Sequence, residues 1–403
     1  MMRIAGIFLT ILGALACWSC GDVDEPSVAA GTRRTVLVYM SAANSLGTGE
    51  FDRSDLAEMR EGVEASLPQD CRWIVYHHAY DAAPVLVELT RHGADTIIAY
   101  SPEIYSTDGL RLRSVARDVM RVAPADGYGL VMWSHSTGWE SPYRPAPSWE
   151  KGPRSWGDDR GTQMDIPALA DALTELRPEF IYFDCCYMAS VEVAYELRDV
   201  TAHIVASPTE VPADGMPYEL NVEALCDIDA DLEGAAMNTY RYYARQASPS
   251  ARSCAMTVID TAPLTRLATV TRAIYSRHGT EAVGYTRQRL DRDREQRFWD
   301  FADHVRALCA GDEELAGEFE EAFAATVRLH RHTSRMWNIW SLDRSTGLSG
   351  YIYPTVGGDP TYRGYDGLQW WRDVVAGAAA GTANADCHSK TKTGQQTLTE
   401  NRH

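Results

Sequence analysis

The chain has 403 residues and a formal net charge of −18 at pH 7, with 45% hydrophobic and 23% charged residues. This length and composition are typical of a globular protein that buries a full core in one or two domains. The acidic balance argues against a nucleic-acid partner, because phosphate binding needs a basic face. The charge is most simply explained by solubility, and it is weakly compatible with a cationic substrate.

The N-terminus has the anatomy of an export signal. A short positive region, Met1–Arg3, precedes an apolar stretch over residues 4–16 that is too short to span a bilayer. Cys20 follows, which predicts a bacterial lipoprotein signal peptide of residues 1–20 with Cys20 as the lipidated residue. The alternatives are lipidation of Cys17, or a plain secretory signal with an incidental cysteine. We expect an exported chain, lipid-anchored to a bacterial outer membrane or cell surface, with a linker over residues 21–34.

Apolar runs and helical spacing alternate from residue 35 onward. The apolar β runs predict strands, and inward-facing residues at helical spacing predict the helices between them. Thr107 or Asp108 is the expected N-cap of the second helix. The expected strands are 36–40, 73–76, 84–90 and 96–100, the last two joined by a turn at His92-Gly93, and the expected helices are 52–65 and 108–122.

Two buried strands then end in residues that can carry chemistry. The run 128–135 ends in His135, and the run 180–186 ends in Cys185 and Cys186. A helix over 166–176 lies between them, so the two strands belong to a right-handed βαβ unit and are parallel. Parallel strands that start on one side end at the same edge of the sheet, where α/β proteins place their ligands. The sequence therefore predicts that His135 and Cys186 converge.

The segment between these strands is unusual. Residues 136–163 contain four prolines, which exclude helix and central strand. A loop of this length within a compact domain is usually functional or mobile.

The pattern changes to helices past residue 230. An α/β unit is expected over 35–225, with a helix over 190–197 and a strand over 203–207, and a largely helical region over 226–380 is expected to complete the fold. Beyond residue 381 the sequence is polar without periodicity, which predicts a disordered tail. In the C-terminal region we expect helices over 235–244, 264–275, 298–308, 313–330 and 368–375, and strands over 255–259 and 350–354.

The remaining cysteines show no zinc-type spacing and no dense disulfide framework. Some of them can pair in an exported protein, but the sequence does not say which. Adjacent Cys185 and Cys186 are poor disulfide partners, because the bond would strain the peptide between them.

Cys186 and His135 suit nucleophilic catalysis. A cysteine nucleophile needs a histidine to move its proton and backbone N–H groups to hold the oxyanion. Cys186 is expected between a strand and a helix N-terminus, whose dipole would lower the pKa of the thiol. A lone cysteine is more often a small core residue, and a lone histidine at a strand end is usually structural. Their positions at consecutive strand ends bring the two interpretations to about even odds.

Several motifs resemble the clostripain family of cysteine peptidases, in the caspase-like clan. The likeness covers most of residues 35–218. The motifs are Val38-Tyr39-Met40, Asn44-Ser45-Leu46, Asp55-Leu56-Ala57-Glu58-Met59, Trp133-Ser134-His135-Ser136-Thr137-Gly138-Trp139 and Phe183-Asp184-Cys185-Cys186-Tyr187-Met188-Ala189 with Glu192.

The resemblance implies a caspase-like three-layer sandwich with a mostly parallel central sheet. It implies an endopeptidase that cuts protein or peptide substrates after Arg or Lys, with Cys186 as nucleophile, His135 as proton carrier, and the backbone of Ser136 and Cys186 as the oxyanion hole. Asp184 and Asp214 would hold the basic side chain, since carboxylates pair bidentately with guanidinium. An ordinary turn aspartate is an equal alternative for Asp214.

Two further properties follow only from the resemblance. Some members cleave themselves in the loop after the histidine, where Lys151, Arg154 and Arg160 are the candidates here. Some members depend on calcium, so a calcium requirement is open, although the sequence contains no self-standing calcium loop. No other metal or cofactor is expected.

A second function from another class remains open. The residue after the histidine is usually glycine in the family and is Ser136 here, and Cys185 stands in an alanine position. These departures suit a catalytically inactive relative that keeps the fold and binds peptides or a partner protein at the cell surface. A related peptidase with acidic or Asn preference is a third, weaker option.

Overall fold

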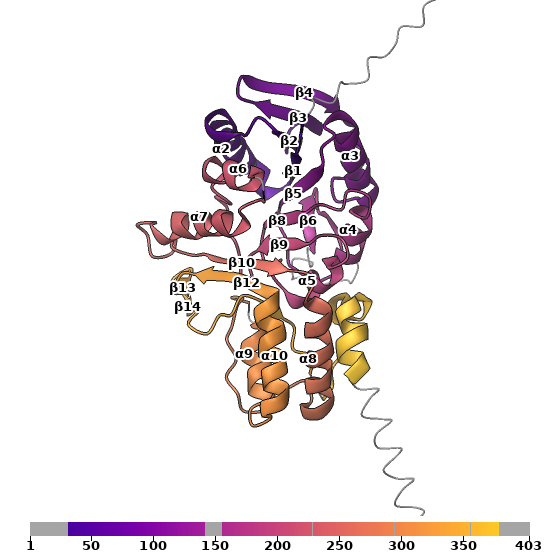
Figure 1. The fold of residues 1–403 in the computed structure, drawn as a ribbon, viewed down its shortest axis with the longest axis vertical. Helices are drawn as coiled ribbons and strands as arrows, with labels where there is room; N and C mark the ends of the chain where they lie inside the picture. The colour runs from indigo at the N-terminus through magenta and orange to yellow at the C-terminus, as the bar shows by residue number, and fades with distance from the viewer. Residues whose placement is uncertain (1–30, 142–154, 228, 294, 355, 379–403) are drawn as a thin grey trace, which may run out of the picture.

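The computed structural model describes residues 31–141, 155–227, 229–293, 295–354 and 356–378 (Figure 1). The expected signal peptide, Cys20, Lys151, Arg154 and the tail beyond 381 lie outside these ranges. Within them, no helix combines the length and the apolar character that a membrane span requires.

One nine-stranded sheet organises the molecule, in the order β12-β10-β9-β8-β5-β1-β2-β3-β4. The five central strands, β9 to β2, are parallel, and antiparallel strands extend both edges. The mostly parallel sheet expected from the sequence is therefore confirmed. The strands are β1 Arg34–Ser41, β2 Cys71–His78, β3 Val85–Thr90, β4 Gly93–Ala99, β5 Gly127–Trp133, β8 Phe180–Asp184, β9 His203–Ala206, β10 Ala255–Asp260 and β12 Val327–His332.

The central strands are apolar on both faces, because helices cover both. Along β1, Val36, Val38 and Met40 pack into one core, while Leu37 and Tyr39 pack into the other. All of β1 is buried. A parallel strand between two helical layers reads as a continuous apolar run, which is the pattern that predicted it.

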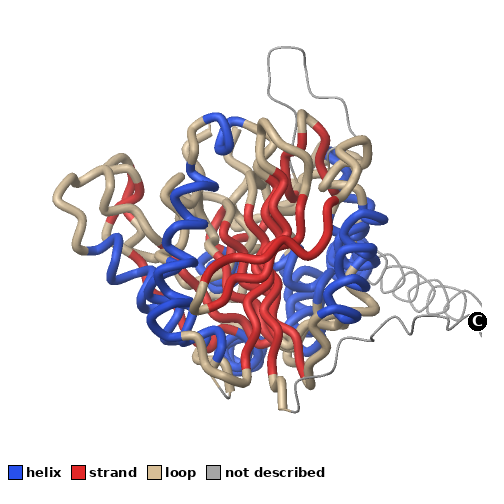
Figure 2. Tube along the Cα trace, turned by 90° about the horizontal axis from the view of Figure 1, so that it is seen from above, coloured by secondary structure: helices blue, strands red, loops and turns tan. Residues whose placement is uncertain are grey.

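Helices form a layer on each side of the sheet, so the strands run between them when the molecule is seen from above (Figure 2). Helices α2, α6 and α7 cover one face, and α3, α4 and α5 cover the other. This is the three-layer sandwich that the resemblance implied. The helices are α1 Ser45–Thr48, α2 Phe51–Ser66, α3 Gly109–Val122, α4 Ile166–Ala172, α5 Val191–Leu197, α6 Tyr218–Cys226 and α7 Leu232–Ala244.

The C-terminal part both extends the sheet and adds a helical group. Strands β10 and β12 join the sheet edge beyond β9, and helices α8 Leu264–His278, α9 Phe301–Leu308 and α10 Glu313–Thr326 pack together below it (Figure 1). A further helical turn, Trp371–Val375, packs on α8. The core beneath these helices is continuous with the core of one sheet face.

Four local predictions were wrong. The expected helix 313–330 ends at Thr326, because Val327–His332 pairs with β10 as an edge strand. The expected strand 350–354 is reduced to the two-residue β15 Ser349–Gly350, which pairs with β11 Trp299–Asp300. Helix α4 ends four residues before the expected position 176, and α6 was not expected at all.

The proline-rich segment contains a small hairpin, contrary to the loop expected throughout. Strands β6 Trp156–Asp159 and β7 Thr162–Met164 pair with each other, with Arg160 at positive φ in the turn. The sequence Trp-Gly-Asp-Asp lacks the alternation by which strands are recognised. The hairpin lies against β1, so the residues that follow position 154 lie beside the sheet.

A disulfide joins Cys71, at the start of β2, to Cys226, at the end of α6. The other cysteines of the described part, Cys185, Cys186, Cys254 and Cys309, are free thiols. The expectation that Cys185 and Cys186 do not pair with each other agrees with this arrangement.

Candidate active site

The site lies at the carboxyl edge of the parallel strands, and the register aligns its residues. Trp133 at the end of β5 pairs with Asp184 at the end of β8. His135 and Cys186 each follow two residues later, so they leave the sheet at the same level on neighbouring strands. The hydroxyl of Ser136 donates a hydrogen bond to the backbone carbonyl of Cys186, which ties the two strand ends together.

Both residues line one cavity of about 260 Å³. Its walls come from the ends of β1, β5, β8 and β9 and from two loops of the C-terminal part. The lining residues are Leu46, Trp133, Ser134, His135, Asp184, Cys185, Cys186, Glu210, Val211, Pro212, Ala213, Gly215, Arg292 and Trp337.

His135 is held from two sides. Its Nε2 atom lies 2.8 Å from the hydroxyl of Ser45, the first residue of α1. Its backbone carbonyl accepts a hydrogen bond of 2.8 Å from the N–H of Gly157 in β6. His135 is therefore held by a residue that follows β1 and by the β6–β7 hairpin.

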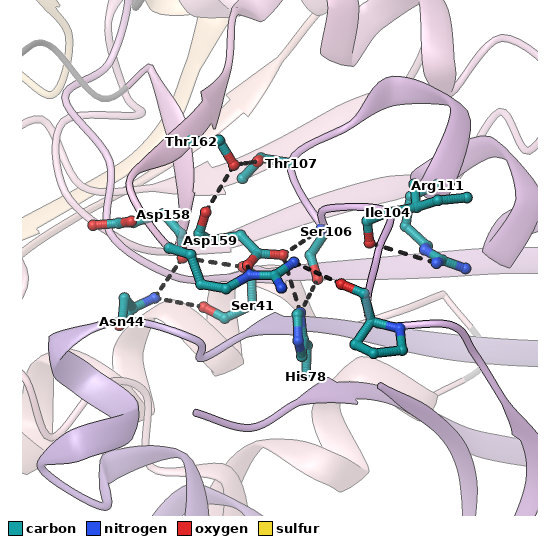
Figure 3. A network of polar contacts seen from close by, with 12 residues as sticks. Ser41, Asn44, His78, Ile104, Ser106, Thr107, Arg111, Asp158, Asp159 and Thr162 are labelled. Atoms are coloured by element: carbon teal, nitrogen blue, oxygen red, sulfur yellow. Dashed lines mark hydrogen bonds and ion pairs between the residues drawn. The ribbon is translucent and has the colours of Figure 1, made fainter. Parts of the chain in front are cut away.

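A buried polar network anchors that hairpin to the sheet edge (Figure 3). The amide of Asn44 donates to the carbonyl of Asp158 at 2.7 Å, and the carboxylate of Asp159 lies 3.0 Å from Nδ1 of His78. The N–H of Ser106 donates to the same carboxylate at 2.5 Å. Buried polar groups that satisfy one another in this way hold a single arrangement.

The thiol of Cys186 is enclosed. The N–H of Val211 donates to its sulfur at 3.3 Å. Burial raises the pKa of Cys186 to about 12, and the nearby charge of Glu210 adds to the rise. The expected lowering by a helix dipole is not found, because α5 begins only at Val191, beyond the turn that follows the cysteines. The raised pKa favours the neutral thiol over the thiolate, so attack by the sulfur calls for a base.

The cavity is also lined by a buried carboxylate, that of Asp184. Asp184 is 6% exposed, and its Oδ2 atom accepts hydrogen bonds of 3.0 Å from the N–H of Met216 and the hydroxyl of Tyr218. Burial raises the pKa of Asp184 to about 6. Among the described residues it forms no ion pair.

Asp55, from α2, lies beside Asp184. A Cβ atom at residue 215 would lie 2.8 Å from Oδ2 of Asp184 and 3.2 Å from Oδ2 of Asp55, so only glycine, at φ +63°, fits between them and the loop. Trp133 donates its indole N–H to Asp55 at 2.6 Å. Burial, followed by the charge of Asp184, raises the pKa of Asp55 to about 9. Asp214 is exposed in the same loop and acts on Asp55 only through its charge.

Two residues of the C-terminal part, Arg292 and Trp337, also line the cavity. Arg292 forms an ion pair of 3.0 Å with Glu210, and Trp337 donates its indole N–H to the other oxygen of Glu210. Trp337 and Asn338 both have positive φ, 52° and 57°, at the tip of the hairpin formed by β13 Arg335–Met336 and β14 Trp340–Ser341. A bulky residue in this conformation is strained, which is common where a side chain must be aimed at a site.

A sequence profile of the clostripain family matches residues 38–305. The chain belongs to this family. A comparison with curated protein sequences found no match.

Solved clostripain-family structures are similar over most of their length. An inactive zymogen C11 protease from Parabacteroides distasonis is 27% identical, with a TM-score of 0.73, over 85% of this chain and 97% of that one. A secreted C11 cysteine protease from Bacteroides thetaiotaomicron, in complex with an irreversible peptide inhibitor, is 29% identical, with a TM-score of 0.72, over 85% and 98%. A structure described as the B. thetaiotaomicron protease "iotapain" is 26% identical, with a TM-score of 0.74, over 85% and 99%. The chain is therefore a cysteine peptidase of the clostripain family, with the caspase-like fold of these proteases.

The family sequence pattern left some of the site unnamed. Asp55 and Ser45 occur in the motifs but were given no role, and a polar residue on a helix face carries no signal of its own. Glu210, Arg292 and Trp337 come from irregular segments far apart in sequence. Asp55 comes near Asp184 only through tertiary packing, which leaves no pattern in the sequence.

Two other predicted positions have defined surroundings. Ser136 has no positive φ, so serine meets no backbone conflict at the position where the family usually has glycine. The guanidinium of Arg160 pairs with Asp159 at 2.8 Å and donates to the carbonyl of Pro102. Among the described residues, no cluster of three His, Cys, Asp or Glu residues is arranged to hold a metal ion.

Proposed function

We propose that the protein is an endopeptidase that hydrolyses peptide bonds after Arg or Lys, with Cys186 as nucleophile and His135 as its proton carrier. The observation that carries this proposal is the buried carboxylate of Asp184, which shares the cavity of the thiol and imidazole and lacks a cationic partner among the described residues.

The chemistry begins with a neutral thiol. As the sulfur of Cys186 attacks the scissile carbonyl, its proton passes to the imidazole of His135, because burial disfavours a free thiolate. The imidazolium then gives this proton to the leaving amine, which frees the C-terminal product. Water attacks the thioester, His135 accepts its proton, and the proton returns to the sulfur as the acid product leaves. The backbone N–H groups of Ser136 and Cys186 are the proposed oxyanion donors.

Specificity follows from charge. A buried carboxylate with raised pKa gains most from a cation that enters beside it, since the cation restores the ionised form. Arg supplies a planar fork of donors to such a carboxylate, and Lys supplies a point charge. Asp184 is the proposed direct partner, Asp55 lies behind it, and Asp214 at the rim attracts the incoming cation.

A fluorogenic peptide ending in Arg tests the proposal. Wild type should cleave it, and Cys186→Ala and His135→Ala should each lose at least about a thousandfold in kcat. Cys185→Ala is the matched control, because it removes a neighbouring thiol and should leave cleavage intact. Turnover that survives in Cys186→Ala would refute the assignment.

The inactive alternative makes a different prediction. An Arg chloromethyl ketone should alkylate Cys186 in an active enzyme and should leave it unmodified in a protein that only binds peptides. The features that favour this alternative are Ser136 and the extra Cys185. A library of peptides varied at the residue before the cut bond separates basic from acidic or Asn preference.

Anchoring is proposed from the N-terminal sequence alone. A lipid on Cys20 would hold the peptidase at a bacterial membrane, where it would act on exported or external proteins. Labelling with a palmitate analogue tests this, and absence of label on the mature protein would refute it.

Self-cleavage after Lys151, Arg154 or Arg160 is also proposed. Arg160 is the poorest of the three candidates, because its guanidinium is already paired with Asp159. On a gel run with reductant, two fragments from wild type and an intact chain from Cys186→Ala would support self-cleavage. Activity with and without a chelator tests for a calcium requirement.

A further inference from the structure

We infer that Ser45 orients His135 and is a third member of the proton-transfer group with Cys186. This inference rests on the proposed function and deepens it. Its basis is the distance of 2.8 Å between the hydroxyl oxygen of Ser45 and Nε2 of His135.

The position of Ser45 is fixed by the residue before it. Asn44 is buried, and its side-chain oxygen accepts a hydrogen bond of 2.8 Å from the N–H of Leu46. Its amide nitrogen donates to the carbonyls of Ser41 and Asp158 at 2.9 Å and 2.7 Å (Figure 3). The turn that carries the Ser45 hydroxyl is therefore tied to β1 and to the hairpin.

The same residues hold the backbone of His135. The hydroxyl of Ser134 donates to the carbonyl of Ser41 at 2.9 Å and accepts from the N–H of Asp158 at 3.0 Å. Gly157, the neighbour of Asp158, donates to the carbonyl of His135. Ser41 and Asp158 bond both to Asn44, beside Ser45, and to Ser134, beside His135. These shared bonds fix the Ser45 hydroxyl and the His135 imidazole relative to each other.

The chemical consequence concerns the tautomer of the imidazole. The hydroxyl of Ser45 can accept from Nε2–H or donate to Nε2, depending on the tautomer of the imidazole. In the inferred role it accepts, which keeps the ring proton on Nε2 and makes Nδ1 the nitrogen that takes the thiol proton. After the transfer both ring nitrogens carry hydrogen, and Ser45 continues to accept from Nε2–H. A third group in this role fixes the base without itself changing protonation. Ser45 is thus a positioning residue that acts through His135.

Three variants test the role by kinetics on the Arg peptide. Ser45→Ala should lower kcat by roughly fivefold, the effect of one neutral hydrogen bond, with KM unchanged. Ser45→Thr keeps a hydroxyl and should recover most of the loss. Thr48→Ala, in the same exposed turn, removes a hydroxyl that donates only to the backbone of Ser45 and should behave as wild type. Equal activity in Ser45→Ala and wild type would overturn the inference.

A readout that needs no activity separates this inference from the peptidase assignment. In Cys186→Ala protein with ¹⁵N-labelled histidine, the ring signals of His135 are assigned by their loss in His135→Gln. We expect the Nε2–H tautomer with Ser45 present and more Nδ1–H tautomer in Ser45→Ala. A tautomer indifferent to residue 45 overturns the inference even if kcat falls. A tautomer that shifts in Cys186→Ala, together with a wild-type protein that does not cleave the Arg peptide, supports the positioning and refutes the proposed function.

Discussion

Two buried carboxylates in this protein have opposite surroundings. Glu140, shortly after His135, is 1% exposed and lies 2.6 Å from Arg297 and 3.0 Å from Arg363. Asp184 is equally enclosed but has only neutral donors around it, a backbone N–H and a tyrosine hydroxyl. Burial raises the pKa of both carboxyls, and the two arginines oppose the rise at Glu140. The charge of Glu140 is thus balanced within the fold, whereas Asp184 is proposed to pair with a cation of the substrate.

The strongest test of this contrast is Glu140→Gln. The change leaves two arginines around a neutral amide, and breaking a buried pair costs about 3–5 kcal/mol of unfolding free energy. Urea denaturation of the mature protein measures the loss. Glu318→Gln, at an exposed helical position, should change stability by less than about 0.5 kcal/mol. A small loss in Glu140→Gln would mean that the two carboxylates are energetically alike.

Asp184→Asn should have the opposite profile. It removes an unpaired buried charge, so stability should stay the same or rise. The kcat/KM for an Arg peptide should fall roughly 30- to 150-fold, because the charge-assisted hydrogen bonds are lost. This factor corresponds to about 2–3 kcal/mol of lost transition-state stabilisation. A matched citrulline peptide should lose much less. Equal losses with Arg and citrulline would show that Asp184 acts on the fold and not on the substrate's charge.

Stability should also depend on pH through Asp55. Its folded-state pKa of about 9 lies above the unfolded value of about 3.9, so the folded protein binds the extra proton between these limits. The contribution of this proton to the free energy of unfolding is complete below the unfolded-state pKa. It is lost as the pH rises through the folded-state pKa. Asp55→Asn should therefore gain stability relative to wild type between pH 5 and pH 8, by at most about 1.4 kcal/mol per pH unit. Parallel stability curves for the two proteins would contradict the raised pKa.

The smallest effect on stability is expected from Arg292→Ala. Glu210, the partner of Arg292, has one cationic partner, whereas Glu140 has two and Asp184 has none among the described residues. Glu210 has a cation, but the side chain of Arg292 is 55% exposed. Arg292→Ala should cost less than about 1 kcal/mol of stability, since solvent screens the pair. Denaturation of this variant beside Glu140→Gln gives the ranking directly. A cost as large as that of Glu140→Gln would break it.

The sequence predicted the elements that bury apolar side chains on a regular pattern. The strands before His135 and Cys186 were found because both faces of a parallel strand are covered, and their convergence follows from the handedness of the βαβ unit. The edge strand Val327–His332 was taken for helix, because pairing with β10 overrides its local pattern.

Much of the site was beyond the reach of the sequence for a physical reason. Asp55 and Trp337 matter through contacts between distant segments, and neither leaves a periodic trace. The raised pKa of Cys186 comes from burial of the sulfur in the folded chain, which the N–H of Val211 partly opposes by donating to it. The expectation of a lowered value rested on a helix end that proved to be too far along the chain.

The bond between Cys71 and Cys226 encloses the stretch of chain that contains both His135 and Cys186. A single backbone cut anywhere between these cysteines would therefore open a ring without releasing a piece. Such a nicked protein would migrate as one band on a gel without reductant and as two with it. A measurement of molecular size without reductant would therefore not detect a cut between Cys71 and Cys226.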